Sequence, residues 1–274
     1  MNEFARTACI FALLLLAASG APGQVYILGE LAQEKTALPG EAYEGSIVIR
    51  NDATEPAEAR VYQTGYSFSC DGRTTYGPPE SQQRSNASWI TFKPTRVVIP
   101  ARGSITVTYA VTVPSDSGGK PLQGTYWSML MVEGIGKESP ESSVPGADKK
   151  PHLGIQQVIR YGLQVATHIA NTGSRSVKFL EANVVPGKSG KPSLQFDLEN
   201  SGDLGIRPEV SVEIFDAKGT SRGKYTGTRY RIYPGTSVHE VIEFPAPPAG
   251  EYKALVLVDA GDDDVFGAQY TLKF

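Results

Sequence analysis

Few residues of this chain combine the type and spacing that catalysis or metal binding requires. The three histidines, His152, His168 and His239, have no neighbour at metal-ligand spacing, whereas a zinc site needs several such ligands. The sequence has no G-x-S-x-G nucleophile elbow and no glycine-rich phosphate loop. A triad assembled only by the fold stays open as an alternative. The pattern nevertheless predicts a protein that is not an enzyme and that uses no cofactor or metal.

An acidic run near the C-terminus has two interpretations. Asp262, Asp263 and Asp264 follow Gly261, and clustered carboxylates can hold Ca²⁺. The same run is typical of a hairpin tip between two strands, because water screens like charges there. The sequence favours the hairpin tip.

Residues 153–165 are the segment that best suits binding rather than chemistry. Apolar side chains alternate with Gly, Gln and Arg160 over 13 residues, roughly 43 Å of extended chain at about 3.3 Å per residue. A long apolar strand at a sheet edge invites pairing with another chain. The sequence therefore predicts an edge strand that binds a partner through Leu153, Ile155, Ile159, Arg160 and Tyr161.

A second apolar segment, residues 125–133, adds to the predicted partner surface. Leu130 and Val132 alternate toward a core, yet Trp127, Met129 and Met131 make the opposite face apolar as well. Exposed Trp and Met in a cluster favour a partner surface. The alternative is that two domains pack on each other and bury this face, and the sequence supports both equally.

The first 23 residues read as a signal peptide for export. Arg6 precedes an apolar run from Ala8 to Ala18, which is followed by small residues up to Gly23. The run is too short for a membrane helix of about 20 residues, so we expect a mature form without a membrane span. Cys70 is then the one cysteine of the mature chain, which excludes an internal disulfide and favours a free, partly buried thiol.

Composition indicates many short strands rather than helices. Gly, Pro and Tyr number 29, 19 and 13 among 274 residues, and such residues are typical of turns and strands. The net charge is −3, and the longest basic cluster is the pair Lys149–Lys150. This excludes the basic stripe that nucleic-acid binding requires.

Strand patterns repeat along the chain and predict two domains of one fold. Residues 124–133 align with residues 250–259, and residues 47–51 align with residues 196–200, so that Asn51 matches Asn200. The fold class is therefore all-β, with two tandem immunoglobulin-like β-sandwich domains after the signal peptide. We expect domain 1 at residues 24–165, with a long loop at residues 134–152, and domain 2 at residues 166–274.

Residues 25–165 resemble, at the level of their pattern, the first domain of periplasmic pilus-assembly chaperones. The resemblance is carried by Trp89-Ile90-Thr91-Phe92-Lys93-Pro94, by the pattern from Val97 to Pro114, and by Gly124-Thr125-Tyr126-Trp127. In that family the last strand of domain 1 lends apolar side chains to a pilin subunit that lacks a strand. The resemblance implies the same role for Leu153, Ile155, Ile159 and Tyr161.

One departure bears on the client. Pilus chaperones grip the subunit's terminal carboxylate with an Arg on the first strand and a Lys on the long strand, but residues 25–34 contain neither, and Arg160 is the only cation on the long strand. The leading hypothesis is a periplasmic chaperone-like protein that binds an exported, pilin-like subunit by strand addition. The alternative is a cell-envelope adhesion or scaffold protein, which could also sit at the cell surface.

Overall fold

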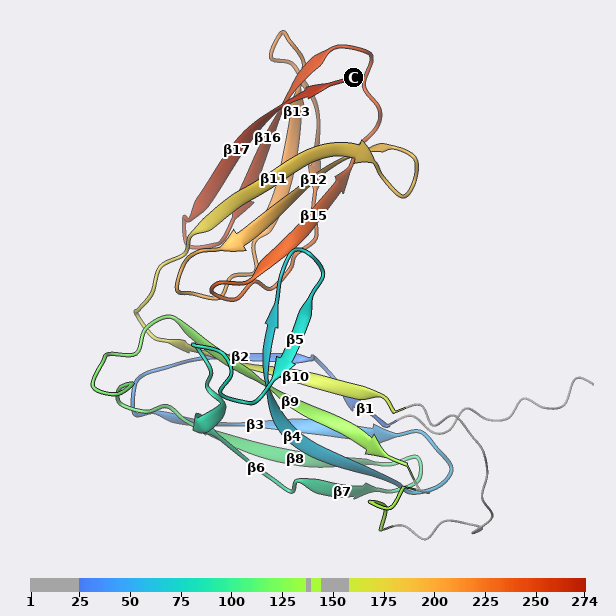
Figure 1. Cartoon of the computed structure of the whole chain (residues 1–274), viewed down its shortest axis with the longest axis vertical. Helices are drawn as coiled ribbons and strands as arrows, with labels where there is room; N and C mark the ends of the chain where they lie inside the picture. Colours follow the sequence, from blue (N-terminus) through green and yellow to red (C-terminus); the bar gives the residue numbers. More distant parts are fainter. Residues whose placement is uncertain (1–24, 137–138, 144–157) are drawn as a thin grey trace, which may run out of the picture.

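The chain forms two β-sandwiches that stand at an angle to each other (Figure 1). The computed structural model describes residues 25–136, 139–143 and 158–274. The predicted signal peptide, most of the predicted loop, and Leu153 and Ile155 lie outside these residues. Within them, strands dominate and the only helical element is the short 3₁₀ turn η1 (Ala87–Trp89), which confirms the predicted all-β class. In the described part of the chain, no helix is long and apolar enough to cross a membrane.

The first sandwich consists of two facing sheets. Its strands are β1 (Val25–Leu28), β2 (Ala32–Ala37), β3 (Ala42–Asn51), β4 (Ala57–Phe68), β5 (Thr74–Gly77), β6 (Ile90–Lys93), β7 (Arg96–Ile99), β8 (Ser104–Thr112), β9 (Thr125–Ile135) and β10 (Arg160–Ile169). One sheet has the order β1-β3-β8-β6, and the other has the order β2-β10-β9-β4-β5, with β7 also paired to β4. Strand β10 ends at Ile169, so this sheet continues past the boundary predicted at residue 165, and the division into domains stays a prediction.

Alternating apolar side chains fill the space between these two sheets. Ile47 and Ile49 on β3, Val107 on β8, and Leu130 and Val132 on β9 are all buried. Because successive side chains of a strand point to opposite faces, a period of two residues places one set in the core.

The second sandwich repeats this plan with fewer strands. Its strands are β11 (Val177–Pro186), β12 (Pro192–Asn200), β13 (Glu209–Phe215), β14 (Ser221–Thr226), β15 (Ser237–Glu243), β16 (Glu251–Asp259) and β17 (Val265–Lys273). The sheet orders are β11-β12-β15 and β14-β13-β16-β17. Leu198 on β12 and Val256 on β16 are fully buried between them.

The internal repeat seen in the sequence has a structural counterpart. Strands β9 and β16 occupy equivalent central places, and β3 and β12 each end in a fully buried asparagine. Asn51 accepts a hydrogen bond from the Ala53 amide at 2.9 Å and donates to the Glu55 carbonyl at 2.8 Å. Asn200 makes the same pair of bonds two and four residues later, at 3.0 and 2.7 Å. Both asparagines thus hold the turn that leaves the strand.

The hairpin of β4 and β5 links the two sandwiches. Its turn contains Asp71 and Gly72, with Gly72 at φ +82°. The hairpin rises from the first sandwich to the second (Figure 1), where Phe68 packs beside Tyr233 with ring centroids 6.4 Å apart. The Cys70 amide donates to the Ser237 hydroxyl at 2.9 Å.

Candidate binding site

Strand β10 has one open edge at its beginning. It pairs with β9 in antiparallel fashion from Arg160 to His168, but with β2 in parallel fashion only from Gln164 to Ile169. Among the described residues, the stretch from Arg160 to Leu163 therefore has a strand on one side only. The Gln164 amide donates to the Leu31 carbonyl, so alternation turns the N–H and C=O groups of Gly162 and Arg160 toward the same open side.

The opening exists because the first strand of the sandwich changes sheets. β1 pairs with β3 as far as Leu28, while β2 begins its pairing with β10 at Ala32. Gly29, at φ +96°, lies in the crossover between them, a backbone conformation that favours glycine. Apolar side chains surround the gap: Leu28, Leu31 and Val158 are 44%, 44% and 48% exposed.

The side chains predicted to bind a partner at this edge lie as follows. Ile159 and Tyr161 are half-buried, and Tyr161 packs against the core of the first sandwich. Arg160 is exposed, and its Nε donates to Glu133 on β9 at 2.7 Å. The partner roles of these residues stay a prediction, as do those of Leu153 and Ile155.

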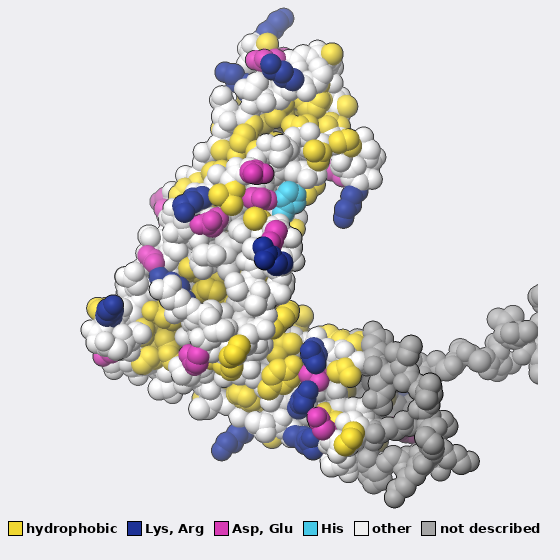
Figure 2. Space-filling model, in the orientation of Figure 1, with side chains coloured by type: hydrophobic (Ala, Val, Ile, Leu, Met, Phe, Trp, Pro, Cys, Tyr) yellow, Lys and Arg dark blue, Asp and Glu magenta, His cyan; other side chains and the backbone are white. Residues whose placement is uncertain are grey.

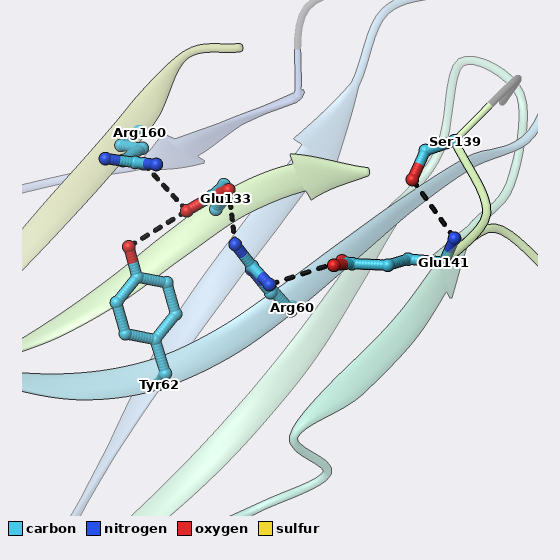
Figure 3. A network of polar contacts seen from close by, with 6 residues as sticks. All are labelled: Arg60, Tyr62, Glu133, Ser139, Glu141 and Arg160. Atoms are coloured by element: carbon cyan, nitrogen blue, oxygen red, sulfur yellow. Dashed lines mark hydrogen bonds and ion pairs between the residues drawn. The ribbon is translucent and has the colours of Figure 1, made fainter. Parts of the chain in front are cut away.

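Glu133 is the centre of a polar network beside the open edge (Figure 3). It accepts hydrogen bonds from Arg60 at 2.7 Å, from Tyr62 at 2.9 Å and from Arg160. Burial by itself raises the pKa of Glu133, but these three hydrogen bonds outweigh it and leave the pKa below its ordinary value. The network therefore holds a carboxylate in its charged form and fixes β4, β9 and β10 to one another.

The residues that follow β9 are attached to this network. Predicted as part of the loop at residues 134–152, Gly134 and Ile135 instead continue the strand. Glu141 pairs with Arg60 at 3.2 Å, and its amide donates to the Ser139 hydroxyl (Figure 3). The contact between Glu141 and Arg60 thus holds residues 139–143 beside β4.

Trp127, Met129 and Met131 lie on the outer face of the sheet but are buried, with exposed fractions of 3%, 4% and 7%. The Trp127 ring stacks on Tyr233 of the second sandwich, with centroids 4.6 Å apart and planes 9° apart. Met129 lies against Gly162, where an added Cβ would fall 2.2 Å from its Sδ. For Trp127 the structure therefore agrees with the domain-interface interpretation. That the three side chains form a partner surface stays a prediction. Little of their area is exposed to a partner.

Several residues of this interface were not found from sequence. Arg84 pairs with Asp203, and Arg231 pairs with Glu34, each at 2.5 Å. The Tyr233 hydroxyl donates to Gln164 at 2.8 Å. Glu34 and Arg231 are 197 positions apart, and no local pattern connects residues at such a separation.

A histidine lies within the interface. His168 Nδ1 is 2.7 Å from the Thr125 hydroxyl. Burial lowers the pKa of His168, and the effects of Glu34 and Arg231 on it oppose each other. His168 is therefore a packed, neutral side chain at pH 7.

The remaining candidates for chemistry have structural roles. Arg175 pairs with Asp262 at 2.7 Å and with Asp264 at 3.3 Å, in the turn between β16 and β17. This is the predicted hairpin tip. His239 contacts Asp197 at 2.6 Å on an exposed sheet face. Across residues 25–136, 139–143 and 158–274, no group of His, Cys, Asp and Glu side chains is arranged to hold a metal ion.

Comparison with known proteins adds a likeness of fold. No protein-family model matches the chain, and no curated protein matches its sequence. Among solved structures, the chain resembles fimbrial chaperones. CfaA, a class 5 fimbriae chaperone, has a TM-score of 0.46 and 10% sequence identity, with 90% of this chain and 98% of that chain covered.

Two further structures are similar to a comparable extent. The E. coli chaperone DraB has a TM-score of 0.41 and 14% identity, covering 92% of this chain and 99% of its own. A chain from the complex of the Salmonella enterica SafA pilin with the SafB chaperone has a TM-score of 0.42 and 11% identity, covering 91% and 96%. What these proteins share with the chain is the fold.

Proposed function

We propose that the chain is a periplasmic, non-enzymatic, chaperone-like protein that binds an exported, pilin-like subunit by β-strand addition to the beginning of β10. The observation that carries this proposal is the open edge at residues 160–163. An incoming strand would pair with the backbone of Arg160 and Gly162, because both residues direct their N–H and C=O groups to that side.

The surroundings of the edge suit an apolar strand. Leu28, Leu31 and Val158 are large exposed apolar side chains around the gap, and their burial by a partner would contribute about 25 cal/mol per Å² of apolar surface. The Glu133 network consumes the nearby charges, since both Arg60 and Arg160 donate to Glu133. The partner strand would therefore be recognised by its backbone and by alternating apolar side chains.

The choice of client and compartment rests on the sequence. The predicted signal peptide directs the chain to the periplasm, and the resemblance of residues 25–165 to pilus chaperones points to a pilin-like subunit. Pairing with this edge would also protect a strand-deficient subunit from aggregation. The subunit's own unpaired edge would be covered for as long as the two exported proteins stay bound to each other.

A photo-crosslinking amino acid at Val158, in cells that export the protein, tests the proposal. We expect capture of one small exported protein, and no such capture from Val98, a control position that is 47% exposed on β7. Identical captures from Val158 and Val98 would contradict strand addition at this edge.

Two variants of Arg160 separate backbone pairing from side-chain contact. Arg160→Gln and Arg160→Pro both lose the contact with Glu133, but only proline removes the N–H on the open side. We expect Arg160→Pro to abolish capture at Val158 and Arg160→Gln to retain most of it. Equal capture by the two variants would mean that the partner does not pair with the β10 backbone.

A further inference from the structure

Strand β17 presents a second open edge, on the other sandwich. It is the last strand of its sheet and pairs only with β16 among the described residues. Gly250 and Phe274 exchange two backbone hydrogen bonds of 3.0 Å, which fixes the alternation along the ladder. The N–H and C=O groups that point away from β16 are therefore those of Val265, Gly267, Gln269, Thr271 and Lys273.

A groove lies beside this edge. Its volume is about 520 Å³, and it separates β17 from β11, the edge strand of the facing sheet. The lining mixes apolar side chains, such as Val184, Tyr270 and Leu272, with polar ones, such as Asn183, Glu251 and Lys273. Figure 2 shows hydrophobic side chains gathered on the face of the upper sandwich that carries β11. Two open strand edges thus border one groove on the same side of the sandwich.

Apart from the exposed Lys273 at its end, the edge lacks the features that usually prevent pairing. Strand β17 has nine residues, contains no proline, and is paired to β16 without a bulge. Long regular edges of this kind associate with other strands unless something covers them. The question is which strand fits.

We propose that the occupant is a second copy of this chain, whose β17 pairs antiparallel with the first around a twofold axis at Gln269. In this register Val265 lies opposite Lys273, and Gly267 lies opposite Thr271. On the core side, Ala268 faces Tyr270. Small residues are thereby matched with large ones across the axis, and the two sheets join into one. The same axis places the groove of each copy, at residues 270–273, beside residues 265–268 of the other copy's β17.

Charge complementarity favours a copy of the same strand. Arg175 neutralises Asp262 and Asp264 at the beginning of β17 but is not paired with Asp263. At the other end, the Lys273 side chain is 80% exposed, and its Nζ lies 3.8 Å from Glu251, whose side chain is 61% exposed. Antiparallel pairing sets Lys273 of one copy opposite Val265 of the other, next to the turn that carries Asp263. Each end of the joint thus brings a lysine near an acidic turn.

The proposed dimer is independent of the proposed chaperone role. Strand β17 borders the side of the upper sandwich opposite to the beginning of β10 on the lower one (Figure 1). Both copies would keep their β10 edges accessible in the dimer.

Sedimentation equilibrium over a range of protein concentrations tests the dimer with a matched pair of variants. Gln269→Pro removes an outward N–H without breaking a bond to β16, so it should leave the monomer folded and weaken dimerisation at least tenfold. Lys224→Pro is the control on β14, at the opposite edge of the same sheet. The Gly227 amide donates to Val210, so alternation turns the Lys224 N–H outward as well. Lys224→Pro should dimerise like the unmodified protein.

Charge reversal provides a second measurement. Lys273→Glu and Asp263→Lys should each weaken the dimer several-fold, and the two together should restore it. A protein that remains monomeric throughout the concentration range overturns the proposal. So does a Gln269→Pro variant that dimerises as tightly as the unmodified protein, because the contact would then lie elsewhere.

Discussion

Glu240 is a buried carboxyl group whose charge is affected by the fold. It is buried on β15, its Oε2 accepts a hydrogen bond from the Thr228 amide at 3.1 Å, and its Oε1 has no partner in the described part of the chain. Burial raises the pKa of Glu240 from 4.5 to about 7. The folded protein therefore holds this proton to a higher pH than the unfolded chain.

The raised pKa of Glu240 makes the stability of the fold depend on pH. The contribution of Glu240 to the free energy of unfolding is fully present below about pH 4.5, and it is lost as the pH rises to about 7. We expect Glu240→Gln to raise the free energy of unfolding at pH 8 by about 1–2 kcal/mol. This gain in stability is smaller than the pKa shift alone implies, because the side-chain NH₂ group of the new glutamine lacks a hydrogen-bond acceptor. At pH 4 the variant should show no gain in urea denaturation.

Glu243, on the same strand, is the control for this measurement. Its hydrogen bond from the Ser189 hydroxyl lowers the pKa of Glu243, so the charged form is favoured and Glu243→Gln should lose stability at pH 8. A gain at pH 8 from both substitutions would show that the effect is one of net charge and not of burial.

Individual residues were predictable where a role depends on local order. The alignment of Asn51 with Asn200 paired two residues that have the same role in the structure, because each bonds to backbone groups two and four residues ahead. Tyr233 was not predictable. Its contacts with Trp127 and Gln164 join segments that only the folded chain brings together.

Among the elements, the β4–β5 hairpin is the one that reaches from one sandwich to the other. Phe68 near its end packs beside Tyr66 and Tyr233, and the half-buried Cys70 follows in the turn. In a chain that lacks the predicted signal peptide and therefore keeps Cys70 as its one cysteine, we expect Phe68→Ala to release the hairpin and to speed the reaction of Cys70 with a maleimide several-fold. Aromatic packing of this kind contributes about 0.5–1.5 kcal/mol in addition to the burial of apolar area. The loss of this free energy determines how much more often the hairpin opens.

Tyr76 supplies the matched control for the hairpin. It is an aromatic residue of the same hairpin, near Tyr66, but it is 56% exposed. Tyr76→Ala should leave the labelling rate of Cys70 nearly unchanged. Equal rates in the Phe68→Ala variant and the unmodified protein would show that Phe68 does not dock the hairpin.

The bounds of β10 could be predicted from the sequence only in part. Alternation placed a strand at residues 153–165, whereas the strand in the described chain runs from Arg160 to Ile169. Ala166 and Thr167 are both fully buried, because one face meets the core and the other meets the domain interface. A strand covered on both faces loses its alternation, so its end could not be located from the pattern.

At the scale of the whole molecule, the angle between the sandwiches depends on a close backbone contact. Gly124, at φ +69°, precedes β9, and an added Cβ there would lie 2.2 Å from the carbonyl oxygen of Asp203 in the second sandwich. The Thr125 amide donates to that same oxygen at 2.8 Å. The contact leaves no room for a side chain and is held by a backbone hydrogen bond.

Gly124→Ala should therefore loosen the joint while each sandwich stays folded. The substitution forces alanine into a left-handed conformation and pushes Asp203 away, at a cost of about 1–3 kcal/mol. We expect a broader distribution of dimensions in small-angle X-ray scattering and faster proteolysis in the linker at residues 170–176. Gly134→Ala is the control, since a Cβ at that β9 position meets nothing within 4 Å. If both variants scatter like the unmodified protein, the angle is set by the Trp127–Tyr233 stack and the two interdomain ion pairs instead. If both loosen the joint, the effect belongs to β9 and not to the contact with Asp203.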